Sequence, residues 1–190
     1  RAVLHVVDTG IEIPMDDIKD RWGDIDNTTL MTLLAENEER TGRIARHIAK
    51  LRKEGRVVIA FSQRLAQLDL FIQAMRDLGF DPGRIDGRVP PKERNRILET
   101  HGLTVAITRT AKLGLDRRDK ALNTAVFLLP ERTELTILQA IGRAQRADKP
   151  AHLYAYRDKN PVCRRKIQAV IDLCRHEGWV LVKEKLKEAQ

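Results

Sequence analysis

Cysteine pairs, histidine clusters and long apolar runs are all missing from this sequence. Its two cysteines, Cys163 and Cys174, are far apart and form no CxxC, which favours ordinary buried thiols in a reducing cytosol. The five histidines show no ligand spacing, so no metal site is predicted. No apolar run approaches the ~18 residues of a membrane span and no signal peptide is present, so we expect an intracellular, cytoplasmic protein with no membrane partner.

Two further absences concern the start of the chain and the usual enzyme patterns. The chain has no initiator methionine and opens at Arg1 directly into an apolar stretch, so we expect it to be a fragment. No G-x-G-x-x-G follows a first strand, and no catalytic triad spacing occurs. An ordinary doubly wound, nucleotide-dependent enzyme is therefore a weak alternative.

What the sequence does contain is a basic, globular composition. With 190 residues, of which 42% are hydrophobic, it can form one cored domain or one domain plus an appendage. The formal charge is +8 and the pI is about 9.8. These values favour a polyanionic partner, with nucleic acid first, although a merely basic surface is the alternative.

Apolar runs alternate with amphipathic stretches along the chain. Strands are expected at 3–7, 56–61, 83–86, 103–108, 123–129, 151–156 and around WVLV at 179–182. Helices are expected at 37–55, 65–79, 90–100, over QAIGRAQR, and at 161–177. Residues 8–27 are expected to have little regular structure, and the tail KEKLKEAQ to be a charged helix end or frayed. This order predicts an α/β fold with three layers, helices covering both faces of a mostly parallel sheet.

Polar trios follow three of these strands directly. Ligands of such sheets bind at the carboxyl ends of the strands, and phosphate oxygens need hydroxyls, glycine amides and arginines. The trios therefore predict phosphate binding, although a turn containing Ser or Gly is also common. They are Ser62-Gln63-Arg64, Gly87-Arg88-Val89 and Thr108-Arg109-Thr110.

A row of basic residues continues from the second trio. Arg88, Lys92 and Arg96 are spaced i, i+4, i+8, so they form one stripe if the helix extends back to Arg88. Arg94 points elsewhere and is expected to pair internally. The alternative for the row is a solvated helix face.

Two further segments carry candidate ligands. In the loop TRTAKLGLD, Gly114 permits a tight turn and Asp116 presents a carboxylate that can accept hydroxyl hydrogen bonds, for instance from a ribose, or cap a helix. In QAIGRAQR, spacing i, i+4, i+7 places Gln139, Arg143 and Arg146 on one helix face. A solvated basic face is again the alternative.

The order and spacing of these motifs resemble a known family. SQR after an apolar strand, DG with a basic helix, T-x-x-x-x-x-G-L-D and Q-x-x-G-R-x-x-R resemble the second RecA-like domain (helicase C-terminal domain) of a superfamily-two DEAD/DEAH-like helicase, closest to phage or mobile-element types. The resemblance covers roughly residues 37–157, and the helix and strand of the tail resemble the segment that closes this domain. It implies a linker segment with a first strand over 1–36, the domain at 37–157 and a packed extension at 158–190. Arg109 and Arg117-Arg118 depart from the family, which usually has aspartate and proline there.

The resemblance also implies roles for the candidate residues. Arg143 and Arg146 would be the arginine fingers of motif VI, with Gln139 beside the same γ-phosphate, and Gly114 and Asp116 of motif V would meet the ATP ribose. The implied grip on nucleic-acid phosphates, with DNA favoured over RNA, falls to Ser62, Arg64, Gly87, Arg88, Lys92, Thr108 and Arg109.

The motifs that would bind ATP and Mg²⁺ are absent from the sequence. No GxxxxGK and no DExD or DExH occurs. In this family they lie on the N-terminal RecA-like domain, the implied partner in the same protein, so this chain alone is expected to have no significant ATPase activity. The alternative is a stand-alone nucleic-acid-binding or regulatory domain without ATPase activity.

Overall fold

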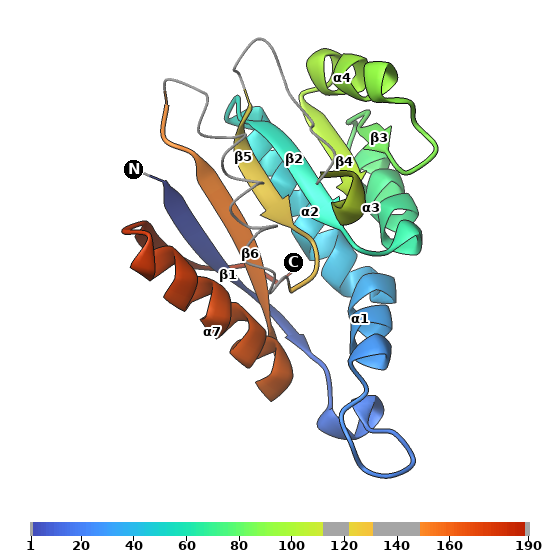
Figure 1. The fold of residues 1–190 in the computed structure, drawn as a ribbon, viewed down its shortest axis with the longest axis vertical. Coiled ribbons are helices and arrows are strands. Elements are labelled where there is room, and N and C mark those ends of the chain that lie inside the picture. Colours follow the sequence, from blue (N-terminus) through green and yellow to red (C-terminus); the bar gives the residue numbers. More distant parts are fainter. Residues whose placement is uncertain (1, 112–121, 131–148, 189–190) are drawn as a thin grey trace.

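A computed structural model describes residues 2–111, 122–130 and 149–188 of the chain (Figure 1). Seven parallel strands form one sheet in the order β3-β4-β2-β5-β6-β1-β7. The strands are β1 (Val3–Glu12), β2 (Val57–Ser62), β3 (Gly83–Ile85), β4 (Leu103–Ile107), β5 (Leu122–Phe127), β6 (His152–Lys159) and β7 (Val180–Lys185). All their carboxyl ends therefore lie along one edge of the sheet.

Helices cover both faces of this sheet, which confirms the predicted three layers (Figure 1). On one face lie α2 (Glu38–Lys53) and α3 (Leu65–Asp77), and on the other lie α4 (Pro91–Thr100) and α7 (Pro161–His176). The remaining helices are α1 (Asn27–Glu36), the four-residue α5 (Thr108–Ala111) and the 3₁₀ helix η1 (Met15–Ile18).

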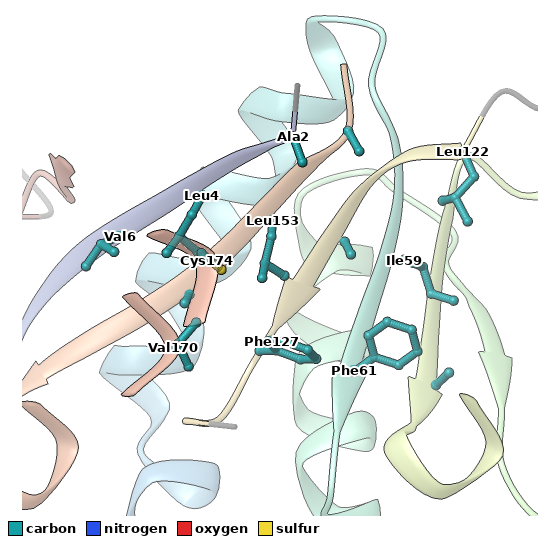
Figure 2. Packing of buried hydrophobic residues seen from close by; sticks show 14 of the residues in the cluster. Ala2, Leu4, Val6, Ile59, Phe61, Leu122, Phe127, Leu153, Val170 and Cys174 are labelled. Carbon is teal, nitrogen blue, oxygen red and sulfur yellow. The ribbon is translucent and has the colours of Figure 1, made fainter. Parts of the chain in front are cut away.

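The alternation of side chains along the strands divides the core into two layers. In β2, Ile59 and Phe61 point into the layer beneath α4 and α7, where Phe61 lies near Phe127 and Leu153 near Val170 (Figure 2). The intervening Val58 and Ala60 point into the layer beneath α2 and α3. Burial on both faces explains why the central strands are continuous apolar runs.

Local signals end the helices where the sequence predicted. The Asn37 side chain accepts a hydrogen bond from the Arg40 amide (2.8 Å) and caps α2, and Gly55 follows that helix at φ +82°. Pro91 occupies the first turn of α4. Cys163 and Cys174 are free buried thiols, as expected, and burial raises the pKa of each to about 12.

The prediction of little regular structure over residues 8–27 is wrong. β1 continues to Glu12, because buried Thr9 and Ile11 alternate with outward-facing neighbours, the period of a half-buried strand. A bulge at Gly10, with φ +73°, interrupts this pattern and obscures it in the sequence. η1 follows, and Asp26 then caps α1, which the sequence reading missed.

The prediction of a charged helix end or a frayed tail from residue 183 is wrong for residues 183–185. Residues 183–185 continue β7 as an edge strand beside β1, and their alternating charges suit a strand with one exposed face. The division at residues 36 and 157 stays a prediction, since strands from all three segments belong to the same sheet. In the part of the chain that the structure describes, no helix has the length and apolarity needed to cross a bilayer.

Candidate functional site

Strand register brings the predicted polar trios together. Ser62 at the end of β2 is paired with Ile107 at the end of β4, and Ile85 of β3 is paired with Ala106. The residues that follow these strands, 62–64, 86–88 and 108–110, consequently occupy adjacent positions at the carboxyl edge of the sheet. The structure thus confirms that segments far apart in sequence meet at one edge.

The turn after β2 is held by its own side chains. Ser62 is only 1% exposed, and its hydroxyl donates to Gln67 Oε1 (2.5 Å) while accepting from the Arg64 amide (3.0 Å). The half-buried Arg64 extends a guanidinium nitrogen to the carbonyl of Thr28 in α1 (3.4 Å). Ser62 therefore shapes the β2–α3 turn, and its contact with a phosphate stays a prediction.

The turn after β3 is organised by Asp86, which the sequence reading did not single out. Its buried carboxylate accepts the Arg88 amide (2.9 Å), the Arg88 Nη2 (2.8 Å) and the Arg84 Nε (3.2 Å). These bonds, those from Arg88 first, hold the pKa of Asp86 well below its usual range. Gly87 is exposed, with open space where a Cβ would be. The signal in the sequence was the Asp-Gly pair itself, since Asp bonds amides two residues onward in turns.

The predicted stripe from Arg88 through Lys92 to Arg96 is wrong at its first member. α4 begins at Pro91, so Arg88 lies before the helix and bends back to Asp86. Arg94 is buried and its Nε donates to the carbonyl of Val89 (2.7 Å), which confirms its internal role.

Two exposed cations follow β3 and β4 and have no charge partner among the described residues. Lys92 in the first turn of α4 and Arg109 in α5 form no ion pair with any residue that the structure describes. Thr108, beside Arg109, is 7% exposed and begins α5. The side chains of Lys92 and Arg109 are thus available to an approaching anion.

A buried polar network supports this edge from below, and sequence reasoning missed it. Arg40 is 0% exposed and forms an ion pair with Asp158 (Nε–Oδ1 2.8 Å). Arg40 also donates a hydrogen bond to the Leu128 carbonyl (2.7 Å), and Gln67 donates to the same carbonyl (3.4 Å). The Thr9 hydroxyl donates to Asp158 (2.6 Å). The network joins α2 and α3 to the ends of β1, β5 and β6. An arginine inside an amphipathic helix pattern gives no signal that it is buried.

The predicted ATP-contacting residues lie outside the described part of the chain. They are Gly114, Asp116, Gln139, Arg143 and Arg146. Within the described ranges, no group of three or more His, Cys, Asp or Glu side chains is placed to hold a metal ion, so we assign no Mg²⁺ ligand there.

Comparison with known families agrees with this geometry. Residues 34–148, more than half of the chain, match the family described as helicase conserved C-terminal domain. The chain belongs to this helicase C-terminal domain family. The predicted resemblance to the second RecA-like domain of a superfamily-two helicase is confirmed at the level of family and fold.

Solved structures of similar fold include three helicase-related proteins. T4 UvsW matches with a TM-score of 0.73 and 15% identity over 99% of this chain and 42% of its own. Domain 2 of the DEAD-box helicase Mss116p, bound to an RNA duplex, matches with a TM-score of 0.65 and 13% identity. The match covers 100% of this chain and 66% of the Mss116p chain. The C-terminal part of the Fun30 ATPase domain matches with a TM-score of 0.58 and 16% identity. The match covers 66% of this chain and 43% of the Fun30 chain.

At these sequence identities the three structures show the fold alone. This chain covers 66% or less of the length of each of the three solved chains. A comparison with curated protein sequences finds no significant match.

Proposed function

We propose that this helicase C-terminal domain is the second RecA-like domain of an ATP-dependent nucleic-acid helicase or translocase. Two observations together carry the proposal: the family match, and an edge where Arg64, Arg88 and Arg109 closely follow the ends of three adjacent parallel strands, with Lys92 in the first turn of the helix after β3. The net charge of +8 supports a polyanionic ligand at that edge.

The nucleic-acid part of the proposal rests on phosphate contacts. Exposed Lys92 and Arg109 would bind phosphates directly, and the open backbone at Gly87 allows a strand to approach closely. Arg88 would share its guanidinium between Asp86 and a phosphate. Ser62, Arg64 and Thr108 complete the proposed track. That Mss116p domain 2 was solved with an RNA duplex supports nucleic acid as the ligand, and we keep DNA as the favoured polymer.

The ATP part of the proposal rests on family membership. ATP, held with Mg²⁺ mainly by an N-terminal RecA-like domain, would supply the phosphoryl group that is transferred to water. Arg143 and Arg146 would stabilise the charge that develops on it, since a guanidinium is always charged and forks onto phosphate oxygens. Gln139, Gly114 and Asp116 would line the same interdomain cleft. A stand-alone nucleic-acid-binding domain without ATPase activity is the second candidate, because the chain carries no GxxxxGK.

The nucleic-acid proposal is tested by the binding of fluorescent single-stranded 12-mers to the chain. Lys92→Ala with Arg109→Ala removes two free cations at the edge, and we expect affinity to fall about three- to tenfold. The loss should be equal for unrelated sequences, because phosphate contacts carry no base information.

The matched control is Lys53→Ala with Arg175→Ala. It removes the same two residue types from exposed positions near the carboxyl ends of α2 and α7, at the opposite edge of the sheet. If this control weakened binding as much as the edge variant, or if one sequence were strongly preferred, the track would be misplaced.

A further inference from the structure

A hollow of about 520 Å³ opens at the carboxyl ends of β1, β6 and β7, away from the track just described. Its walls come from β1, the first turn of α7, α2 and the segment after β7. Because every strand of the sheet is parallel, the hollow shares the carboxyl edge with the proposed track. Between β2 and β1 lie three strand spacings, roughly 14 Å.

The lining of this hollow is predominantly cationic. Arg43 pairs with Glu39, and Arg157 forms a bidentate pair with Asp8 (2.6 and 3.0 Å). Lys159, Arg164 and Lys185 also line it, are exposed, and form no ion pair with described residues. The carboxylates of Asp8, Asp158 and Glu188 line it as well, so the five cations leave an excess of two positive charges. A concave surface with a net charge of one sign raises the local concentration of the opposite ion.

Arg43 makes part of the wall from a nearly buried position. It is 8% exposed, and its Nε has no hydrogen-bond partner among the described residues. The Thr9 carbonyl (2.8 Å) and Glu39 fix its terminal nitrogens. Gly10 lies against it with φ +73°, and a Cβ there would be 2.8 Å from Arg43 Nη1. The backbone of β1 is therefore shaped around this guanidinium.

The first turn of α7 adds a second sign of a binding role. Arg164 stands there, and that turn contains no acidic residue. The positive end of a helix dipole favours anions and disfavours cations, so an arginine in this position reduces the stability of the helix. A bound anion beside Arg164 would offset this cost.

We propose that the hollow is a second phosphate-binding site, which takes the sugar-phosphate backbone of the nucleic acid where it leaves the track. The proposal rests on the proposed function. The volume lies in the range of small-ligand pockets, but the described residues that line it include no aromatic ring on which a base could stack. This lining suits the phosphates and sugars of a polymer better than a free nucleotide.

The test compares Lys159→Ala with Arg164→Ala against the control Lys53→Ala with Arg175→Ala, in the same 12-mer assay. Each variant loses one lysine and one arginine from exposed positions. We expect the hollow variant to bind about three- to tenfold more weakly than the control and to show a salt slope shallower by about 1.4, from 0.7 per lost phosphate contact. Equal affinity and slope in the two variants would overturn the proposal.

The source of the phosphate is identified by titrating the unmodified chain with the 12-mer, with inorganic phosphate and with ATP. Binding is monitored through the NMR resonance of the Gly10 backbone amide. The 12-mer should shift this resonance at concentrations where inorganic phosphate and ATP do not. Saturation by ATP or phosphate at or below the concentration of the 12-mer would overturn the assignment to a polymer backbone. Loss of binding in the Lys92 and Arg109 variant alone would contradict the second site and leave the proposed function standing. Loss in both variants would support the second site, whereas loss in the Lys159 and Arg164 variant alone would contradict the track and with it the continuous path proposed here.

Discussion

The residue that distinguishes this domain most clearly is a fully buried arginine. Arg40 and Asp158 are each 0–1% exposed, and their ion pair lies among the ends of β1, β5 and β6. Removing two charges from water is expensive, so such a pair is stable only if both members remain and are well hydrogen-bonded. Here Thr9 and the Leu128 carbonyl provide part of those bonds, while Arg40 Nη2 and Asp158 Oδ2 are buried without a hydrogen-bond partner among the described residues.

Replacing Asp158 with Ala should therefore destabilise the domain strongly. It leaves the Arg40 charge buried without a partner, and the expected loss in free energy of unfolding is about 3–5 kcal/mol, measured by urea denaturation. Replacing both Arg40 and Asp158 with leucine should lower the free energy of unfolding by clearly less than the sum of the losses in Arg40→Leu and Asp158→Leu, because no unpaired charge then remains. Additive losses would show that the two charges stabilise the domain independently.

The same pair shows where residue-level prediction from the sequence ends. The arginines of α2 read as a polar helix face, and only the tertiary structure reveals that Arg40 and Arg43 are buried. The positions of exposed Arg109 and Lys92 were easier to predict, because Arg109 follows β4 closely and Lys92 stands in the first turn of a helix that Pro91 begins. Their contacts with phosphate stay predictions. Ser62 was predicted as a phosphate ligand from its position alone, and sequence cannot show that its hydrogen is donated to Gln67.

At the scale of elements, the edge strand β7 is joined to the sheet through a histidine cluster. Glu184 of β7 accepts from His5 of β1 (2.6 Å) and lies 3.6 Å from His47 of α2. His5 also bonds His152 of β6 (2.9 Å). Burial lowers the pKa of all three histidines from 6.5, that of His152 to about 4, with the nearby Arg56 adding to the effect at His5 and His152.

This cluster predicts that stability falls on mild acidification. The folded state resists protonation of these histidines, whereas the unfolded chain takes up protons near pH 6.5. Their contribution is therefore complete above about pH 6.5 and is lost as the pH falls toward 4, with a slope of at most about 1.4 kcal/mol per pH unit for each extra proton bound on unfolding.

Urea denaturation at pH 7, 6 and 5 measures this dependence, and His152→Gln should flatten it. A His176→Gln control, on an exposed residue, should leave it unchanged. A free energy of unfolding that stays constant or rises as the pH falls from 7 to 5 would contradict this prediction.

The elements themselves were predicted well wherever the pattern was unambiguous. The continuous apolar runs of β2, β4 and β5 and the periodic helices α2, α3 and α4 stand close to where the sequence placed them. β1 was cut short because Gly10 forms a bulge, and β7 was missed past residue 182 because alternating Lys and Glu resemble a charged helix end. In both cases, pairing with a neighbouring strand determined the outcome.

At the scale of the whole molecule, two proposed roles, nucleic-acid binding and the supply of arginine fingers to ATP, belong to one domain. Nucleic acid is proposed to lie across the carboxyl ends of the strands. Arg143 and Arg146 come later in the chain than β5, and the carbonyl of Leu128, directly after β5, accepts hydrogen bonds from Arg40 and Gln67.

The central claim, that this domain supplies arginine fingers to ATP bound elsewhere, is tested most directly by Arg146→Lys in the protein that joins it to its N-terminal RecA-like domain. Fingers act mostly in the transition state, and the point charge of lysine cannot copy the fork of a guanidinium. The account predicts that kcat for nucleic-acid-stimulated phosphate release falls about 10³-fold or more while ATP affinity changes little. Near-normal turnover in Arg146→Lys would contradict it, as would robust phosphate release by the 190-residue chain alone that Arg146→Ala abolishes.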